Sequence, residues 1–343
     1  MIEPVTYLFS SSTVDCFFGA SFSDIEELVT KENAVIITDA NLIELHFSKF
    51  ESWKQIVINP GEEYKQQATA DYVINELIRL EADRNTILIG VGGGVITDLT
   101  GYIASVYMRG IKCCFIPTTI LCMVDAAIGG KNGVDVGIYK NLVGSFKHPE
   151  FLLYDYAFLE TLPANEWING FAEIIKHAII KDPKLFEQLE NTTIESFKSF
   201  PGKLNALVQA NVKIKCSIVS RDEFEQGERR LLNFGHTIGH AIENICKVPH
   251  GYAVSVGMIA ACAISEQMLN FDHLEYARIT SLLSKYQLPL LLKFDKAKAW
   301  NILVHDKKRT GDGINVILLM AIGDPVIVTV PLRQLENIFN QLF

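Results

Sequence analysis

Three of the eight histidines in this 343-residue chain, His236, His240 and His250, lie within fifteen residues of one another. Histidine is the commonest metal ligand and the usual proton carrier near neutral pH. His236 and His240 are four residues apart, so on a helix they share one face and form a candidate pair of metal ligands. Arg229 and Arg230 shortly precede them. This stretch therefore indicates metal or proton-transfer chemistry.

A second chemical motif is the glycine run in ILIGVGGGVITDLTG, residues 87–101. Glycines between a strand and a helix let backbone N–H groups approach a phosphate, and the helix N-terminus favours negative charge. The run does not match GxGxxG, because the third glycine position falls on Val95 or Thr97. Glycines also occur in tight strand-to-helix turns that bind nothing, but phosphate or dinucleotide binding is the favoured interpretation. GEEYK, residues 61–65, contains glutamates that could accept hydrogen bonds from ribose hydroxyls.

The elements that must position these motifs follow two patterns. Short β-branched runs predict buried strands at residues 34–39, 54–60, 86–94, 112–119 and 151–156, and helical spacing predicts a helix at 67–83. Strand, helix and strand in this order predict a parallel sheet with helices on its faces.

After residue 163 long amphipathic helical patterns dominate, and residues 314–331 predict two extended runs around a Gly-Asp-Pro turn. We therefore expect an α/β Rossmann-like domain over residues 1–157 and a mainly α-helical domain over residues 158–343.

Composition narrows the class of protein. The net charge of −9 argues against nucleic-acid binding, which requires a basic surface. The longest nearly apolar run, residues 253–264, is shorter than the about 20 residues of a membrane span. The N-terminus has no signal-peptide pattern, and seven cysteines without CxxC pairing favour a reducing cytoplasm. Lysines and arginines near the motifs are either solvated surface cations or contacts for an anionic small-molecule substrate.

The motifs of the chain also fall in a distinctive order: GGGVITD, YMRG, PTT, VDAAIGGKNGV, KN, FAEIIKH, LLNFGHTIGHAIE and PHG. In this order they closely resemble the 3-dehydroquinate synthases, sugar-phosphate cyclases of the shikimate pathway. The resemblance runs from about residue 61 to residue 308. It implies a Rossmann-like domain that binds NAD, a helical domain that carries Zn²⁺ or Co²⁺, and an active site between them.

The implied reaction converts 3-deoxy-D-arabino-heptulosonate 7-phosphate to 3-dehydroquinate and phosphate. A hydroxyl is oxidised by NAD, phosphate is eliminated, the ketone is reduced again, and the ring opens and recloses by aldol addition. The resemblance thus implies a lyase of aromatic amino acid biosynthesis with a sugar phosphate as its partner molecule.

The same resemblance assigns roles to individual residues. Glu173, His236 and His250 match the metal ligands, whereas His240 matches a histidine near the substrate and its proton transfers. His177 matches no ligand position. The remaining substrate positions are matched by Asp125, Lys131, Asn141, Lys176, Lys215, Arg229, Asn233 and either Lys307 or Lys308. The NAD positions are matched by Glu62, Lys65, Gly93, Gly94, Asp98, Thr118, Thr119, Lys131 and Lys140.

Arg109, in YMRG, matches a family arginine that reaches the active site of a neighbouring subunit, which implies a homodimer. The alternative is an arginine that caps its own helix. The chain departs from the family pattern at Thr97, where many relatives have glycine, and at Asn132, where threonine is common. The loop between His236 and His250 is two residues shorter than in some relatives.

Three other functions compete with this interpretation. Related cyclases make inosose or valiolone rings, but Asn233, His240 and the lysines of DKK (residues 306–308) agree with a dehydroquinate synthase. Metal-dependent alcohol dehydrogenases share the two-domain plan but do not need so many lysines. A non-catalytic NAD or sugar-phosphate sensor would be expected to lack the three metal-ligand residues, which are present here.

Overall fold

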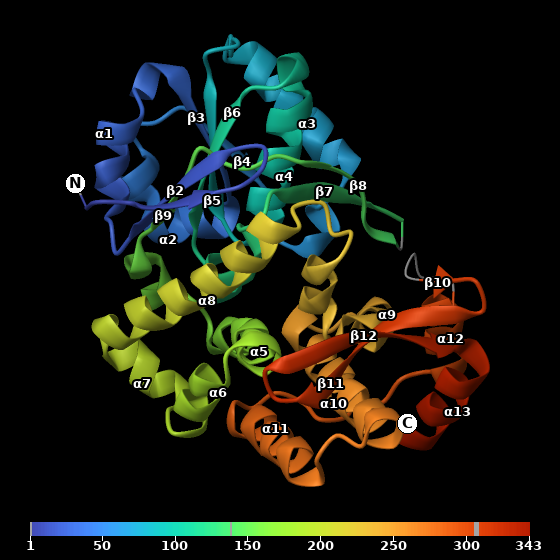
Figure 1. Cartoon of the computed structure of the whole chain (residues 1–343). Coiled ribbons are helices and arrows are strands. Elements are labelled where there is room, and N and C mark those ends of the chain that lie inside the picture. The colour runs from blue at the N-terminus through green and yellow to red at the C-terminus, as the bar shows by residue number, and fades with distance from the viewer. Residues whose placement is uncertain (1, 138, 305–308) are drawn as a thin grey trace. The chain divides into compact units, whose positions relative to one another are not determined.

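The computed structural model describes residues 2–137, 139–304 and 309–343. The chain forms two compact units, coloured along the chain in Figure 1. The N-terminal unit comprises Met1–Glu166 and Asn205–Phe224, and the C-terminal unit comprises Trp167–Leu204 and Glu225–Phe343. The units therefore divide within helix α5 (Ala164–Lys181), and most of α8 (Pro201–Arg221) belongs to the N-terminal unit. The expected domain boundary near residue 157 stays a prediction.

A seven-stranded sheet forms the centre of the N-terminal unit, in the order β1-β2-β9-β6-β5-β3-β4. Its strands are β1 (Val5–Leu8), β2 (Thr13–Phe18), β3 (Ala34–Asp39), β4 (Gln55–Ile58), β5 (Ile87–Gly92), β6 (Lys112–Pro117) and β9 (Phe151–Tyr154). All neighbouring pairs are parallel except β1 with β2. The five predicted strands and the parallel sheet are thus confirmed.

Helices cover this sheet because its strands bury residues on both faces, as parallel strands generally do. The helices are α1 (Ile25–Leu28), α2 (Ala40–Phe50), α3 (Gln67–Arg79) and α4 (Gly94–Val106). Ile36, Ile89 and Leu153 form one apolar cluster with Phe22 and Phe50. The predicted helix at residues 67–83 is confirmed as α3, which is four residues shorter.

The strand order reverses beside β3, because β4 lies on one side of it and β5 on the other. In open α/β sheets ligands bind at the carboxyl ends of the strands next to such a reversal. The glycine run follows β5 at that edge, and residues 118–119 follow the neighbouring strand β6. The fold therefore brings these two candidate cofactor segments to one edge of the sheet.

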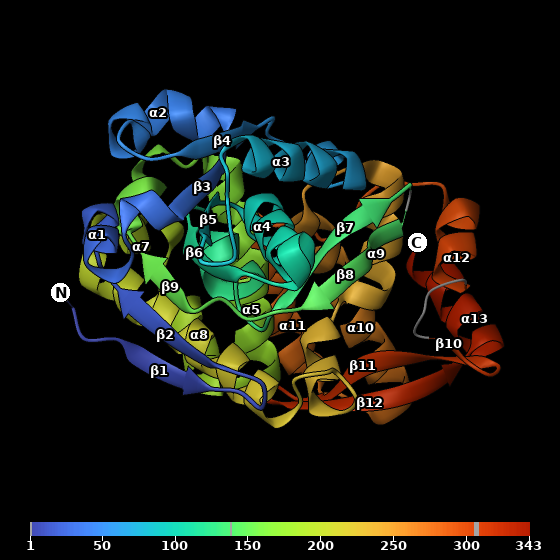
Figure 2. The ribbon, with the colours of Figure 1, turned by 90° about the horizontal axis from the view of Figure 1, so that it is seen from above.

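Two β-hairpins are additions that the sequence patterns did not predict. One is the β1–β2 hairpin, seen beside β9 in Figure 2, and the other is formed by β7 (Lys131–Val136) and β8 (Tyr139–Phe146). β7 packs closely on α4: a Cβ on Gly101 would lie only 2.0 Å from Oδ1 of Asn132. Any larger residue at that position of the helix would therefore displace the buried Asn132 side chain.

The C-terminal unit is mainly helical, as predicted. It contains most of α5, then α6 (Pro183–Glu190), α7 (Ile194–Ser199), α9 (His236–Cys246), α10 (His250–Leu269), α11 (His273–Lys285), α12 (Lys296–Val304) and α13 (Leu332–Leu342). A small sheet has the order β10 (Arg309–Thr310), β11 (Gly313–Ala321) and β12 (Asp324–Pro331). The two extended runs predicted around the Gly-Asp-Pro turn are confirmed as β11 and β12.

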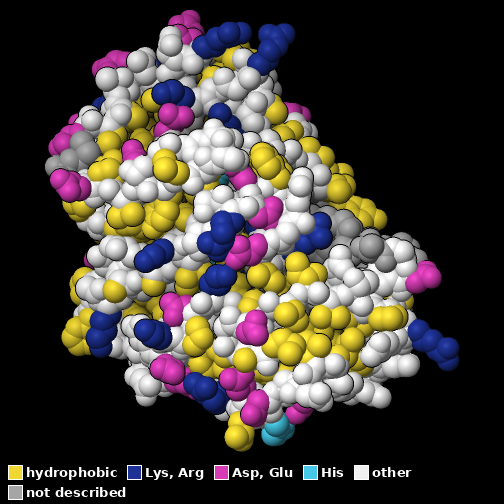
Figure 3. Space-filling model, viewed as in Figure 1, with side chains coloured by type: hydrophobic (Ala, Val, Ile, Leu, Met, Phe, Trp, Pro, Cys, Tyr) yellow, Lys and Arg dark blue, Asp and Glu magenta, His cyan; other side chains and the backbone are white. Residues whose placement is uncertain are grey.

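Helix α10 lies in the core of this unit, where Val256, Ala260 and Ile264 pack against β11. Within the described residues it is the one helix whose length and composition would suit a membrane span, yet 67% of the relevant window is buried in the protein. Its apolar character is therefore accounted for by core packing. On the face in Figure 3, acidic and basic side chains are interspersed, so that face carries no basic stripe.

Candidate metal and cofactor sites

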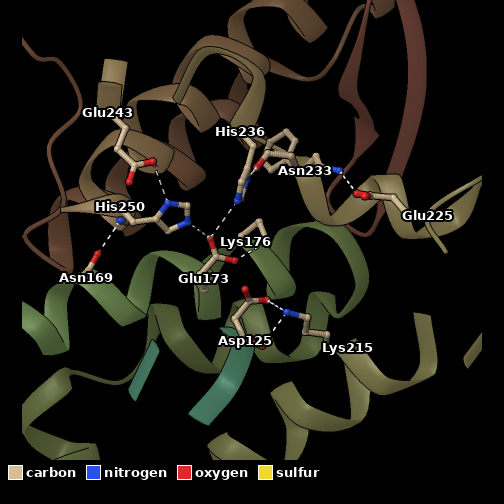
Figure 4. Close-up of polar contacts among 12 residues, drawn as sticks. Asp125, Asn169, Glu173, Lys176, Lys215, Glu225, Asn233, His236, Glu243 and His250 are labelled. Carbon is tan, nitrogen blue, oxygen red and sulfur yellow. Dashed lines mark hydrogen bonds and ion pairs between the residues drawn. The ribbon is translucent and has the colours of Figure 1, made fainter. Parts of the chain in front are cut away.

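The three predicted metal ligands meet in the C-terminal unit (Figure 4). Glu173 lies on α5 and is fully buried. Its Oε1 is 3.3 Å from Nε2 of His250 and 3.6 Å from Nε2 of His236. Glu173 also forms an ion pair with Lys176, one helical turn further along α5, which is also buried. The structure therefore brings a carboxylate and two imidazoles from three different helices to one point.

His236 is held at the start of α9 by a tight turn. Gly235 has a positive φ of 78°, and a Cβ there would lie 2.7 Å from Cγ of Met258, so glycine is required. Nδ1 of His236 is 3.0 Å from the carbonyl oxygen of Phe234. A carbonyl only accepts hydrogen bonds, so Nδ1 carries a proton, and Nε2 is the nitrogen left for a metal ion beside Glu173.

His250 begins α10 where that helix touches α5. The backbone N–H of Gly251 donates to Oδ1 of Asn169 at 2.7 Å, and a Cβ on Gly251 would lie 2.1 Å from the Asn169 carbonyl oxygen. Burial alone would lower the pKa of His250, but hydrogen bonds with Glu173 and Glu243 outweigh it and raise that pKa to about 10 in the metal-free protein.

The donor set fits a zinc-type metal ion. The three ligand atoms of Glu173, His236 and His250 all lie within 4.8 Å of one another. Nitrogen and oxygen ligands lie about 2.0–2.2 Å from zinc, so two ligands at tetrahedral angles are about 3.3 Å apart. The separations of 3.3 and 3.6 Å agree with this spacing.

His240 lies beside the three candidate ligands. Its ring centroid is 5.1 Å from that of His236 and 6.2 Å from that of His250. A second possible ligand group combines His240 with Glu243 and His250. In that group Nδ1 of His250 is the nitrogen next to Glu243, at 3.2 Å from its Oε2.

Other predicted substrate residues also lie in this unit. Arg229 is 2% exposed, in the short 3-10 helix Glu228–Asn233. Nδ2 of Asn233 donates to Oε1 of Glu225 at 2.6 Å. His177 is fully buried on α5, four residues after Glu173. Lys307 and Lys308 lie outside the described residues.

In the N-terminal unit, the glycine run forms the turn from β5 into α4. Gly93 is the N-cap residue of α4 and supplies no side chain, so the first N–H groups of the helix lack a side-chain cap. A Cβ on Gly93 would lie 3.2 Å from Cγ2 of Thr119, and the N–H of Thr118 donates to the Gly92 carbonyl at 3.0 Å. Four predicted NAD residues, Gly93, Gly94, Thr118 and Thr119, thus lie around one helix N-terminus, which suits an anionic group.

The other predicted NAD residues lie close by in the same unit. Lys65 forms a buried ion pair with Asp98 on α4, and Lys140 donates to Glu62 at 3.2 Å. Burial alone would lower the pKa of Lys65, but the charges of Asp98 and Glu62 outweigh it and raise that pKa above its ordinary value. The N–H of Asp135 donates to the Lys65 carbonyl at 2.8 Å, which joins GEEYK to the β7–β8 hairpin.

The substrate residues predicted in the N-terminal unit form a looser set. Nζ of Lys215, on α8, donates to both the carbonyl oxygen and Oδ1 of Asp125, each at 2.7 Å. Lys131 begins β7 and is exposed. Asn141 has a positive φ of 51°, and its N–H donates to Oδ1 of Asp135 at 2.7 Å.

The side chains of Thr97 and Asn132, the two residues that depart from the family pattern, point into the protein interior. The hydroxyl of Thr97 donates to the Gly94 carbonyl at 3.2 Å and lies 3.5 Å from Sγ of Cys122. Nδ2 of Asn132 donates to the carbonyls of Gly130 and Lys147, each at 2.8 Å. Both side chains therefore have structural contacts of their own.

Arg109 lies in an unusual backbone segment after α4. Met108 and Arg109 have positive φ values of 48° and 67°, a region that non-glycine residues rarely adopt. Both side chains are exposed, and within the described part of the chain the guanidinium of Arg109 makes no hydrogen bond or ion pair. The strained and exposed arginine shows no capping contact with its own helix.

Sequence reasoning missed four residues around the predicted ones: Asp135, Glu225 and Glu243 contact predicted residues, and Asn169 contacts Gly251, the neighbour of His250. Only Glu243 carried a usable signal. It lies seven residues after His236, which is two turns along one helix face. The other three are recognisable only from the tertiary contacts.

Comparisons with known proteins agree with this geometry. The family model described as 3-dehydroquinate synthase N-terminal matches residues 55–169, and the one described as 3-dehydroquinate synthase C-terminal matches residues 170–309. A 3-dehydroquinate synthase of Pyrococcus abyssi is 40% identical over 290 residues, which cover 84% of this chain and 85% of that protein. One of Listeria monocytogenes serotype 4b is 39% identical over 316 residues, covering 88% and 86%.

Solved structures show the same fold. A 2-epi-5-epi-valiolone synthase from Streptomyces hygroscopicus with NAD⁺ and Zn²⁺ bound has a TM-score of 0.89 and 27% identity, covering 98% of both chains. A 2-deoxy-scyllo-inosose synthase complexed with carbaglucose-6-phosphate, NAD⁺ and Co²⁺ has a TM-score of 0.88 and 25% identity, covering 98% of this chain and 99% of the other. Because the two family models together match residues 55–309, the chain belongs to the 3-dehydroquinate synthase family.

Proposed function

We propose that this chain converts 3-deoxy-D-arabino-heptulosonate 7-phosphate to 3-dehydroquinate and phosphate, with catalytic NAD and one Zn²⁺ or Co²⁺. The curated relatives with this name are 34–40% identical to the chain, whereas the inosose and valiolone synthases are 25–27% identical. This difference favours the heptulosonate substrate over those of the related cyclases. The curated relatives also favour a lyase of the shikimate pathway over an alcohol dehydrogenase.

The observation that carries the proposal is the arrangement of the donor atoms. Nδ1 of His236 is hydrogen-bonded to the Phe234 carbonyl, and Nδ1 of His250 to the Glu243 carboxylate. The Nε2 atoms of both rings face Glu173. Histidines that bind a metal commonly donate their other N–H in this way. A divalent ion held by these three residues supplies Lewis acidity that lowers the pKa of the substrate hydroxyl to be oxidised.

The other residues have roles that suit an anionic sugar phosphate. Lys131, Lys176, Lys215 and Arg229 supply positive charge for the carboxylate and phosphate, together with Lys307 or Lys308. Asp125, Asn141 and Asn233 offer hydrogen bonds to hydroxyl groups, and His240 moves protons. For NAD, Gly93 and Gly94 present backbone N–H groups to the pyrophosphate, and Glu62, Lys65, Asp98, Thr118, Thr119, Lys131 and Lys140 surround the rest.

Phosphate release from the heptulosonate phosphate tests the proposal. We expect release that requires both a divalent metal and NAD, with NAD needed only in catalytic amounts because it is regenerated in each turnover. NADH that accumulates in step with product would instead indicate an ordinary dehydrogenase. Turnover of a hexose or heptulose phosphate in place of the heptulosonate would indicate a related cyclase.

We also propose that the protein is a homodimer in which Arg109 contributes to the partner's active site. The exposed, strained conformation of Arg109 supports a contact outside its own subunit. Arg109→Ala and Glu173→Gln chains are to be denatured and refolded together. Half of the dimers then contain one chain of each kind, and one of their two sites has no lesion, so roughly a quarter of wild-type activity should return. No recovery, with mixed dimers confirmed by mass, would contradict the shared site.

A cytoplasmic location is proposed as well. All seven cysteines are free thiols and six of them are buried, which suits a reducing compartment. Cell fractionation with an antibody against the chain would test this.

A further inference from the structure

We propose that Glu243 is a positioning residue that orients His250 for metal binding, by accepting the Nδ1–H of its ring. The inference rests on the metal site of the proposed function. Glu243 does not touch the proposed ion; it acts through His250.

The position of Glu243 follows from the geometry of α9. His236, His240 and Glu243 are spaced by four and three residues, so all three lie on one face of the helix. Glu243 is 5% exposed, and its Oε2 is 3.2 Å from Nδ1 of His250. An ionised carboxylate only accepts hydrogen bonds, so Nδ1 of His250 donates to Glu243, and a bound metal ion would take the place of the proton on Nε2. That Nε2 is the atom 3.3 Å from Glu173 (Figure 4).

The two histidines differ in what fixes their rings. The Nδ1 of His236 is bonded to the Phe234 carbonyl, a main-chain group that no substitution removes. The contact of Gly251 with Asn169 fixes the backbone at His250, but it does not fix the rotation of the His250 ring. Its Nδ1 contact is with a side chain, so a single substitution can remove it. Hydrogen-bond partners of this kind typically change metal affinity by about 10- to 100-fold.

Glu243 has a rival role, as a ligand in the group His240, Glu243 and His250. In that case the ion would bind Nδ1 of His250, and Glu173 would take the Nε2–H. The His236 ring argues for the first arrangement, because its Nε2 faces Glu173 while its Nδ1 is already bonded to the backbone. The two roles predict different losses when Glu243 or His240 is replaced.

The chain contains a matched control. Glu266 and His273 are also seven residues apart, and His273 also begins a helix after the one that carries the glutamate. Oε1 of Glu266 is 2.7 Å from Nδ1 of His273, the same type of contact. The His273 side chain, however, is 78% exposed and is not among the candidate ligands. Replacing Glu266 therefore removes an equivalent Glu–His pair without touching the metal site.

The test measures Co²⁺ binding by the full-length protein after its metal has been stripped with a chelator. Affinity is obtained by competition with a chromophoric chelator, and the visible d–d spectrum reports the ligand geometry. We expect Glu243→Ala to weaken Co²⁺ binding about 10- to 100-fold and to shift the spectrum. Glu243→Gln keeps an acceptor oxygen, so its affinity for Co²⁺ should fall less than that of Glu243→Ala. Glu266→Ala and His240→Ala should match the wild type in affinity.

Three results would overturn the inference. Glu243→Ala could bind Co²⁺ with unchanged affinity and spectrum, or Glu266→Ala could weaken binding as much. If Glu243→Ala and His240→Ala both lost Co²⁺ binding as completely as His250→Ala, Glu243 would be a metal ligand. Thermal unfolding of the metal-free variants identifies any that fail to fold. If Glu243→Ala is one of them, Glu243→Gln decides the question, because wild-type affinity and spectrum in it would also overturn the inference.

The metal site of the proposed function fails separately, if the wild-type protein itself does not bind one equivalent of Co²⁺. The positioning role of Glu243 would then fail with it. A wild type that binds Co²⁺ and a Glu243→Ala variant that binds equally well would remove only the positioning role.

Discussion

The candidate cofactor residues of the N-terminal unit and the candidate metal ligands of the C-terminal unit are built in different ways. The cofactor turn relies on backbone groups of residues that are adjacent in the sequence: Gly93 and Gly94 begin α4 directly after β5. The metal group instead relies on side chains of Glu173, His236 and His250, which come from three helices. The first is local, and the second exists only once the helices have packed.

This difference has a consequence for substitutions. A helix N-terminus offers several equivalent N–H groups, so the loss of one neighbouring side chain leaves the anion site largely intact. A three-ligand site loses a third of its donors with one substitution. We therefore expect single substitutions to impair the metal group of the C-terminal unit much more than the cofactor turn of the N-terminal unit.

The largest expected effect is at the metal ligands. Alanine at Glu173, His236 or His250 should abolish stoichiometric metal retention and lower turnover on the order of 10³-fold or more. Metal analysis of the purified variants and the phosphate-release assay measure both effects. His177→Ala, on the same helix as Glu173, is the control and should retain its metal. Full metal occupancy in His236→Ala would refute the assignment.

The next effect concerns the buried pair of Lys65 and Asp98, a part of the cofactor region that depends on side chains. Lys65→Met leaves the carboxylate of Asp98 without its partner, so the free energy of unfolding should fall by about 3 to 5 kcal/mol. NAD binding should weaken too. Adding Asp98→Leu should restore stability, as measured by urea unfolding, but not NAD affinity, as measured by calorimetry. Recovery of both would make the pair purely structural.

A pH-dependent effect of intermediate size is expected at Glu223, which joins α8 to the β1–β2 hairpin. Burial by itself would raise its pKa, but hydrogen bonds from Ser10 and Ser11 and the nearby His148 lower the pKa to about 2. The ordinary value is 4.5, so the stabilisation is complete above that pH and is lost as the pH falls through about 2. It amounts to at most about 3 kcal/mol.

Urea unfolding of the wild type and Glu223→Gln across this pH range tests the prediction. The variant should be less stable at neutral pH and should lose less stability on acidification. Equal slopes in the two proteins would show that Glu223 does not contribute. Such a result would extend to this contact the low sensitivity to side-chain changes that the comparison assigns to the N-terminal region.

The smallest effect is expected at Thr97, within the local cofactor turn. Its hydroxyl is bonded to the Gly94 carbonyl and its side chain is buried beside Cys122. Thr97→Gly should therefore lower the free energy of unfolding by about 1 to 2 kcal/mol and leave the affinity for NAD nearly unchanged. A large gain in NAD affinity would show instead that Thr97 shapes the binding turn.

Much of the architecture could be predicted because it depends on local patterns. The strands from β3 to β6, β9, and the β11–β12 pair follow from apolar runs and their turn residues, and helix α3 from its spacing. The two hairpins were not predicted, because β1 is largely exposed and β8 has little buried surface to produce an apolar pattern. The matches to the family likewise came from the order of motifs along the chain.

The sequence by itself thus determined the class of the elements with clear apolar patterns, the family and the choice of candidate ligands. Only the tertiary structure decided which nitrogen of His236 and of His250 is available, because that depends on the Phe234 carbonyl and on Glu243. It also decided that Gly101 packs against Asn132 from β7, whose side chain any larger residue at position 101 would displace. The physical reason is that periodicity reports only whether a residue is buried. The hydrogen-bond partner of a buried polar group depends on which element packs against it.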